Sequence, residues 1–570
     1  MTTYPTLIIH NAKVHTGVAR RPEAQAIAMT GNRIAAIGTN GQVRSLAGPA
    51  TQMIDAGRRR VIPGLIDAHQ HMIRDALTYN AALHWDGVPS LAIAMHLLAE
   101  QVARTPPPQW VRVIGGFSEC QFEEQRLPTL EELNQVAPST PVAILHLHDR
   151  VLLNAAALRT CDYTRDTHDP PNAHIEWDST GAPTGLFIAM PDTALLEAVL
   201  AHGPTLPYEC QINSTRHFMW ELNRFGITSV IDAGGTHQNY PDDYRAIEEL
   251  QLHRQLTVRV AYHLSAQHAR EELADFAHWT ASIPNHQGDA FYRLNGAGEA
   301  LVHSAMDFSN FRQPRPELSA GMETELERVV RLLVTQRWPW RMHATYDETI
   351  ERALDVFERV DREMPLQGLR WFFDHAETVS DRNLERIARL GGGVVVQPRM
   401  AYQGEYFVAR HGAAAAANTP PFKRMLETGI PVGVGSDASH MGSHNPWATL
   451  HWLTTGKTLG GTSLYPKDRC LGRTTALSLH TQANAWFSDE EGIKGQLDIG
   501  QLADVVVLSD DYFEVSDEAM RHIVSLLTIV DGRIVYADGP FQAHDITPPP
   551  VMPDWSPAQT SGGYWKTTTT

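Results

Sequence analysis

The sequence predicts an α/β fold with a parallel sheet at its centre, and three observations support that class. Continuous apolar runs rich in β-branched residues recur along the middle of the chain, for example at 226–234 and 392–398. Amphipathic helical stretches such as 323–338 and 348–363 lie between such runs. Short strand-like segments and turns occupy both ends of the chain. Apolar strands without polar alternation, separated by helices, indicate a parallel sheet whose two faces are both covered.

The composition is that of an ordinary globular protein. The chain has 570 residues, of which 43% are hydrophobic and 20% are charged, and this balance excludes a disordered, fibrous or coiled-coil chain. No apolar run approaches the roughly 18 residues that a membrane span needs. The formal net charge of −18 argues against nucleic acid or an anionic membrane as a partner. We therefore expect the partner to be a small-molecule substrate.

The two ends of the chain share one sequence pattern, in which short apolar runs are separated by turns. The segment 6–60 contains short apolar runs, with Gly31-Asn32 as the turn of a predicted hairpin. The segment 495–539 contains another hairpin, with Asp531-Gly532 at its tip. We expect residues 1–60 and 490–540 to form one composite β-sandwich around a large central unit.

The central unit, residues 61–489, is expected to be a barrel of eight strand–helix repeats. Nine apolar runs compete for eight strand positions, so at least one of them belongs elsewhere, and the sequence leaves open which. The runs are 60–69, 141–148, 226–234, 257–264, 291–299, 340–344, 369–377, 392–398 and 430–438. A large insertion is expected at about 75–220, with 110–116 as a further strand in it. Residues 541–570 are expected to form an extended tail, partly docked through Trp555 and Trp565.

A pair of histidines follows the first run of the barrel. His69 and His71 stand two residues apart at the end of a predicted strand, so both imidazoles point to the same side. Two such imidazoles can bind one metal ion from adjacent coordination positions. A bare His-x-His motif is a weak signal, because two surface histidines would look the same. Indeed His146 and His148 form a second such motif in this chain.

Three further residues strengthen the metal hypothesis. His343, His375 and Asp437 each lie at the carboxyl end of a predicted strand. In a parallel barrel these strand ends converge on one face, where active sites are found. Histidines and a carboxylate at converging strand ends form a zinc-type ligand set with room for a water molecule.

Together these features resemble the amidohydrolase superfamily of metal-dependent hydrolases. The resemblance covers nearly the whole chain: the two β-rich ends, the His-x-His motif after the first strand, the single histidines 343 and 375, and Asp437. The segments 141–158, 181–185 and 226–234 further resemble the large-insert branch that includes the N-substituted formamide deformylases. The resemblance implies a TIM-like (β/α)8 barrel, a hydrolase acting on an amide or related C–N bond, and a homodimer.

The chain departs from this family pattern at the bridging position. Many members bridge two metal ions with a carboxylated lysine, but this chain has no lysine between residues 14 and 422. Glu299 is the natural substitute, because its two oxygens could span two metals. A one-metal site, in which Glu299 contacts substrate or has no role, remains the alternative. Asp374, directly before His375, is interpreted as a residue that supports a ligand.

The expected mechanism follows from the ion, most simply zinc, present as one or two ions. Asp437 would act as general base for an activated water, while the metal and His375 would polarise the scissile carbonyl. A first alternative keeps the metal barrel but changes the reaction to ester or lactone hydrolysis, deamination, decarboxylation or isomerisation. A second is a non-catalytic scaffold, which the complete set of candidate ligands disfavours.

Substrate-binding residues are less well defined by the sequence. His148 and Asn295 lie at or near predicted strand ends and could hydrogen-bond to substrate, whereas Trp338 and Tyr346 could line an aromatic pocket. Each is also compatible with a purely structural role, since most aromatic side chains are core residues.

The cellular location is predicted from the cysteines and the N-terminal residues. Four cysteines without a Cys-x-x-Cys motif favour reduced thiols. The first residues contain no basic segment followed by an apolar run of secretory length. Both features predict a cytoplasmic protein.

Overall fold

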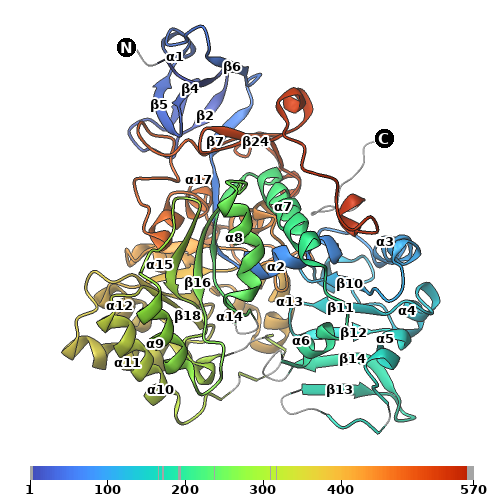
Figure 1. The fold of residues 1–570 in the computed structure, drawn as a ribbon. Helices are drawn as coiled ribbons and strands as arrows, with labels where there is room; N and C mark the ends of the chain where they lie inside the picture. The colour runs from blue at the N-terminus through green and yellow to red at the C-terminus, as the bar shows by residue number, and fades with distance from the viewer. Residues whose placement is uncertain are drawn as a thin grey trace.

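The computed structural model describes residues 4–164, 166–169, 173–189, 194–235, 238–307, 310–312, 314–315 and 317–560. Figure 1 shows three parts: a small β unit at the top, a barrel below it, and an insertion with its own sheet beside the barrel. Among the described residues, no helix combines the length and the apolar character that a membrane crossing requires.

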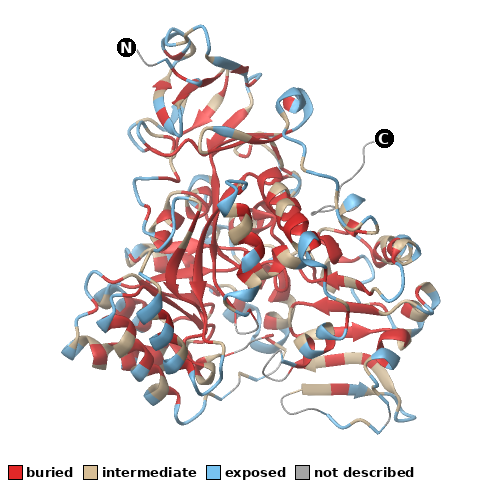
Figure 2. Cartoon of the chain, in the orientation of Figure 1, coloured by how far each residue is buried: buried red, intermediate tan, exposed pale blue. Residues whose placement is uncertain are grey.

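The barrel sheet has eight parallel strands. In sheet order it contains β8 (Leu65–Gln70), β15 (Ile227–Asp232), β16 (Arg259–Leu264), β17 (Tyr292–Ala297), β18 (Trp340–Ala344), β19 (Trp371–His375), β20 (Gly393–Val396) and β21 (Val432–Val434). Nearly every residue of these strands is buried, because helices cover the outer face and side chains fill the interior (Figure 2). The predicted fold class is confirmed. The ninth apolar run, 141–148, lies outside the barrel.

An asparagine side chain joins the last barrel strand to the first. The side chain of Asn484, in the 3-10 helix η6 (Ala483–Ser488), donates to the carbonyl oxygens of Ile66 (2.6 Å) and Val434 (2.8 Å). Its Oδ1 accepts a hydrogen bond from the Val434 amide at 3.1 Å. The backbone of Asp437 then bonds to the carbonyl of His69 at 2.9 Å. These bonds close the barrel beside the ends of β8 and β21.

Amphipathic helices form the outer layer of the barrel. Helix α11 (Asp347–Glu363) buries Ile350, Leu354 and Phe357, which recur at the three- and four-residue spacing of one helix face. The next helix, α12 (Asp381–Leu390), begins where the Ser380 side chain accepts a hydrogen bond from the Asn383 amide. It ends at Gly391, whose φ of 74° lies in the left-handed region that glycine adopts without a steric penalty.

The insertion between β8 and β15 has a six-stranded sheet. In sheet order its strands are β13 (Ala173–Trp177), β14 (Pro183–Ala189), β12 (Arg150–Leu153), β11 (Val142–His146), β10 (Val111–Ile114) and β9 (Ala82–His84). The run 141–148 therefore supplies β11, and 110–116 supplies β10. Helices α3 (Leu91–Arg104) and α4 (Leu130–Val136) cover one face, and α6 (Ala194–Ala201) packs on β14.

Both ends of the chain build the small β unit. One sheet contains β1 (Leu7–His10), β4 (Ala26–Thr30), β5 (Arg33–Gly38) and β6 (Gln52–Asp55). The other combines β2 (Lys13–His15), β3 (Glu23–Ala24) and β7 (Arg60–Pro63) with β22 (Val505–Leu508), β23 (Ser525–Val530) and β24 (Arg533–Ala537). The two sheets share one apolar core. Because β7 runs directly into β8, this unit anchors the first barrel strand.

The C-terminal segment returns across the molecule. Trp555 packs against Ala81, Leu206 and Cys210, at the junction of the insertion and the barrel. The Asn213 side chain, in helix α7 (Tyr208–Arg224), donates to the Pro550 carbonyl at 3.0 Å. Trp565, the second residue expected to dock the tail, lies outside the described residues.

Candidate functional site

Six side chains named by the sequence meet at the carboxyl end of the barrel. They come from the ends of five strands and the loops that follow them, and they are His69, His71, Glu299, His343, His375 and Asp437. None of the six residues is more than 8% exposed. A parallel barrel brings these positions together because all its strands end on one face.

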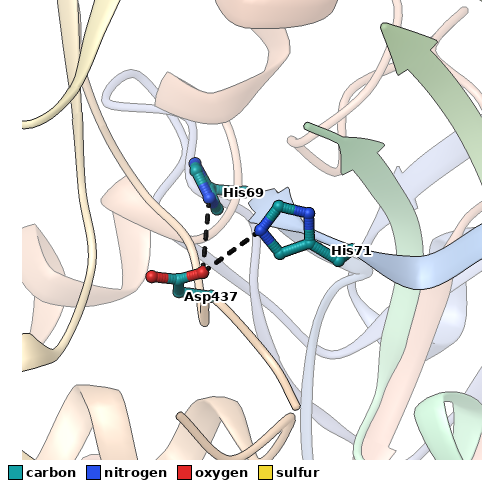
Figure 3. Close-up of side chains that lie close together, drawn as sticks. All are labelled: His69, His71 and Asp437. Carbon is teal, nitrogen blue, oxygen red and sulfur yellow. Dashed lines mark ion pairs between the residues drawn. The ribbon is translucent and has the colours of Figure 1, made fainter. Parts of the chain in front are cut away.

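The first group contains the two histidines of the His-x-His motif and Asp437. In Figure 3 both imidazoles point toward the Asp437 carboxylate. Its Oδ1 lies 3.5 Å from Nε2 of His69 and 3.4 Å from Nε2 of His71. The three ligand-type atoms all lie within 4.8 Å of one another. Such a spacing lets one ion contact all three atoms.

Glu299 joins this group to a second one. Its Oε1 lies 3.6 Å from Nε2 of His71, and its Oε2 lies 3.7 Å from Nε2 of His69. The same Oε2 lies 3.6 Å from Nδ1 of His343 and 3.7 Å from Nε2 of His375. One carboxylate thus faces all four histidines.

The donor set fits a divalent metal ion. At about 2.0–2.1 Å per bond, ligand atoms on a tetrahedral ion lie roughly 3.3–3.5 Å apart, close to the distances in this group. Nε2 of His69, Nε2 of His375 and Oε2 of Glu299 are buried and have no hydrogen bond within the described part of the chain. Buried polar atoms are normally satisfied. A shared cation would satisfy all three.

Three of the four histidines have a carboxylate or carbonyl oxygen at the other side of the ring. Nδ1 of His69 lies 2.9 Å from Oδ1 of Asp374, and Nδ1 of His71 lies 2.6 Å from the Gly234 carbonyl. Nε2 of His343 lies 3.1 Å from Oδ1 of Asp307. A carboxylate or carbonyl behind a histidine fixes the ring orientation and the tautomer that a metal ligand needs.

The carboxylates of the site remain ionised. Burial opposes ionisation of Glu299, but His343 and His375 outweigh it and hold the pKa well below the usual range. For Asp437 burial is likewise outweighed, by His69 and His71, so its pKa also lies well below the usual range. Negative charge at both positions favours cation binding.

Arg399 and Glu377 extend the site on one side. Nη2 of Arg399 lies 3.7 Å from Oδ2 of Asp437, and Nε lies 3.4 Å from Oε1 of Glu377. Both residues are buried, and burial raises the pKa of Glu377 to about 7. The two oxygens of Asp437 therefore face different neighbours. Oδ1 faces His69 and His71, whereas Oδ2 lies near Arg399 and Nδ1 of His375.

The backbone at two site positions is unusual. His375 has a φ of 77° and Asp437 a φ of 55°, in the left-handed region that non-glycine residues rarely adopt. Such conformations are retained where the surrounding structure determines them, and they concentrate at functional sites. Gly435 is required for a related reason, since a Cβ there would lie 2.3 Å from the His69 backbone nitrogen.

The four expected substrate-binding residues do not gather in one place. Asn295 donates to the Phe487 carbonyl and lies 3.1 Å from Nε2 of His263, inside the barrel. Trp338 precedes β18 and packs in the core at the end of the barrel opposite the histidines. Tyr346 follows β18 on the side of the site and is 6% exposed. His148 lies 3.2 Å from Glu197, at the face of the insertion toward the barrel loops.

Three residues near the site were missed by the sequence analysis. Arg399 follows Gln397-Pro398 after β20, so its place at a strand end was an available signal. Glu377 follows His375 by two residues and was available in the same way. Asp307 lies in the long loop between β17 and β18, where nothing in the sequence indicates its contact with His343.

Comparisons with known proteins agree with this architecture. The chain is 26% identical to an N-substituted formamide deformylase of Arthrobacter pascens over 554 residues, which cover 94% of this chain and 99% of that protein. It superimposes on an uncharacterized metal-dependent hydrolase of Pyrococcus horikoshii with a TM-score of 0.64 at 19% identity, over 90% of this chain and 99% of the other. A similar hydrolase of Pyrococcus furiosus gives a TM-score of 0.62 at 20% identity, over 89% of this chain and 100% of the other.

A comparison with models of protein families gives a match over most of the chain. The model of the amidohydrolase family matches residues 52–536, which include the barrel, the insertion and all six converging side chains. The chain therefore belongs to the amidohydrolase family.

Proposed function

We propose that this chain is a metal-dependent hydrolase that cleaves an amide or related C–N bond of a small organic substrate. The observation that carries the proposal is the convergence of four histidines on two ionised, buried carboxylates, at distances of 3.4–3.7 Å between the facing atoms. Such a set has no evident structural purpose, because burying so many polar groups costs stability unless they bind something.

Two groups of residues would hold the metal. His69, His71 and Asp437 would hold one ion, and His343 with His375 would hold a second, with Glu299 shared between them. Zinc is the proposed ion, because imidazole and carboxylate ligands suit it. When bound, such an ion makes water acidic enough to ionise near neutral pH and polarises a carbonyl oxygen. Glu299 would perform the bridging role without a carboxylated lysine.

Asp437 is proposed to move the proton. Its Oδ1 faces His69 and His71, whereas its Oδ2 lies 4.0 Å from Nδ1 of His375 and 3.7 Å from Arg399. One oxygen can therefore serve as a ligand while the other accepts the proton of the attacking water and returns it to the leaving nitrogen. Arg399 keeps this second oxygen in place, and His375 would help to polarise the scissile carbonyl.

The C–N bond is proposed on the relative named above, a formamide deformylase by its name. A substrate contact is proposed for Tyr346, which follows β18 on the side of the site. No substrate contact is proposed for Asn295 or Trp338, since their surroundings give them structural roles.

The test is a substrate panel on zinc-reconstituted, full-length protein. N-substituted formamides, simple amides, esters and lactones of matched size are compared, with metal-free protein and the Asp437→Asn variant as controls. We expect turnover of at least one amide, lost on chelation and restored by zinc, with the variant slower by about 10²–10⁴-fold. Turnover of esters alone would reject the C–N assignment, and turnover that survives chelation would reject the metal mechanism.

We further propose a cytoplasmic homodimer. Reduced thiols support the location, since the structure pairs none of the four cysteines. A two-fold dimer is the commonest closed assembly of such chains. Light scattering on the purified protein measures the mass directly, and a monomer at micromolar concentration would contradict the dimer.

A further inference from the structure

A second histidine–carboxylate cluster lies outside the site described above, where the insertion meets the barrel. It contains His148 from the residues after β11, Glu197 from α6, and His440 from the loop after β21. His148 and Glu197 belong to the insertion, whereas His440 belongs to the barrel and stands three residues after Asp437. The cluster thus spans the junction between these two parts of the molecule.

The spacing of the cluster is close to that of the first site. Nε2 of His148 lies 3.2 Å from Oε1 of Glu197, and Nδ1 of His440 lies 3.9 Å from the same oxygen. All three ligand atoms lie within 4.8 Å of one another. In the first site the corresponding distances are 3.4–3.7 Å. Two imidazoles and one carboxylate form the ligand set of many zinc sites that keep an open fourth position.

His440 is buried and has an unpaired ring nitrogen, which supports a bound ligand independently of the spacing. It is only 9% exposed, and its buried Nδ1 makes no hydrogen bond within the described part of the chain, although it faces Glu197. Its other nitrogen, Nε2, lies 3.9 Å from Oδ1 of Asp75. A carboxylate near one ring nitrogen, and an unpaired buried nitrogen that faces a second carboxylate, are features expected of a metal ligand.

The charges around the cluster favour a cation. Glu197 and Asp75 contribute two carboxylates, and Arg74 is the neighbouring cation, with Nε 3.3 Å from Oδ1 of Asp75. Burial opposes ionisation of Glu197, but His148 outweighs it, so the pKa lies below the usual range. The side chains of His148 and Glu197 are each 22% exposed, which leaves an entry path from solvent.

We propose that His148, Glu197 and His440 form an additional divalent-metal site of the zinc type, distinct from the site at His69 and His71. A cation there would connect the insertion to the loop that carries Asp437, through bonds to both. Its role would be to hold that loop in place, and no step of the proposed hydrolysis passes through it.

Crystallography on the zinc-equilibrated full-length protein tests the site directly. Anomalous difference maps from data on both sides of the zinc absorption edge are expected to show a peak about 2.1 Å from the three named atoms. This peak would be separate from any beside His69. A zinc peak beside His69 together with empty density at His148 and His440 would overturn the proposal. No zinc at either position would overturn it as well.

Metal stoichiometry provides a second test in solution. Glu197→Gln keeps the size of the side chain but removes its charge, and it is expected to lower bound zinc by one equivalent per chain. The matched control is His174→Ala, because His174 lies 2.9 Å from Asp169 in a histidine–carboxylate pair to which the described residues add no third ligand. That control is expected to keep the wild-type stoichiometry. A Glu197→Gln protein with wild-type circular dichroism and undiminished zinc would overturn the proposal.

Discussion

At the scale of single residues, Glu299 is the most informative position. Its two oxygens face different histidines, so one side chain contributes to both groups of the site. We expect Glu299→Gln to reduce bound metal and to lower kcat/KM by at least about 10²-fold, because an amide has one acceptor oxygen and no charge. Zinc content and amide turnover are measured together.

Glu348→Gln is the control for this substitution, since the Glu348 side chain is 58% exposed on α11. It should behave as wild type in both measurements. A Glu299→Gln protein that retains full metal content and full activity would contradict the bridging role and favour a one-metal site.

Asp307 does not face the proposed metal position itself, but lies behind the ring of His343. We expect Asp307→Asn to weaken zinc binding by about 10–100-fold while the fold is retained, because the neutral amide holds the ring of His343 less firmly. Competition with a chromophoric chelator measures the affinity. Asp275→Asn is the matched control, because Asp275 pairs with the exposed His268 at 2.9 Å, away from the site. Equal zinc affinity in the two variants would mean that Asp307 does not position His343.

At the scale of elements, the closure of the barrel depends on Asn484. Its side chain makes three hydrogen bonds that join β8 and β21, which do not pair directly as strands. We expect Asn484→Ala to destabilise the chain by about 2–4 kcal/mol, since it leaves buried backbone groups unsatisfied. Because β8 and β21 lead to His69 and Asp437, zinc affinity should fall as well.

Asn285→Ala is the comparison for the closure, because Asn285 donates one hydrogen bond, at 3.1 Å, to the Arg337 carbonyl. Its Tm should change much less than that of Asn484→Ala. Similar Tm values for the two variants would show that the closure contributes little stability.

The same scale shows what could be predicted from the sequence. The eight barrel strands were identifiable because each is an apolar run buried on both faces, and His343 and His375 because they lie within or at the ends of such runs. The run at 141–148 has the same continuous apolar pattern as the barrel strands, because β11 is equally buried in the insertion sheet. The spacing of apolar residues therefore cannot distinguish a barrel strand from a buried strand of the insertion sheet. Asn484 and Asp307 act from loops, through contacts with distant segments, and no local pattern marks such residues.

At the scale of the whole molecule, a buried ion pair connects the barrel to the β unit. Asp504 lies just before β22 and accepts two hydrogen bonds from Arg259 in β16. They come from Nε at 2.9 Å and from Nη2 at 3.1 Å. We expect Asp504→Asn to lower the stability by about 3 kcal/mol, because it leaves a buried guanidinium with reduced compensation. The shift in Tm measures the effect.

Asp498→Asn is the control for this pair, since Asp498 binds Arg20, whose side chain is 70% exposed. An exposed pair is worth at most about 1 kcal/mol. An equal loss of Tm in both variants would show that the connection between barrel and β unit does not depend on the buried pair.

The composite β unit also sets the order in which the chain can fold during synthesis. Strand β7 emerges early, but its neighbour β22 lies more than 400 residues later. At about 5–20 residues per second, roughly 20–90 s separate the two on the ribosome. Throughout that interval the edge of β7 that pairs with β22 lacks its partner strand. Nascent chains in which β22 has not yet been synthesised are therefore expected to expose an unpaired strand edge that can pair with other chains. We expect them to depend on chaperones until β22, β23 and β24 have been synthesised.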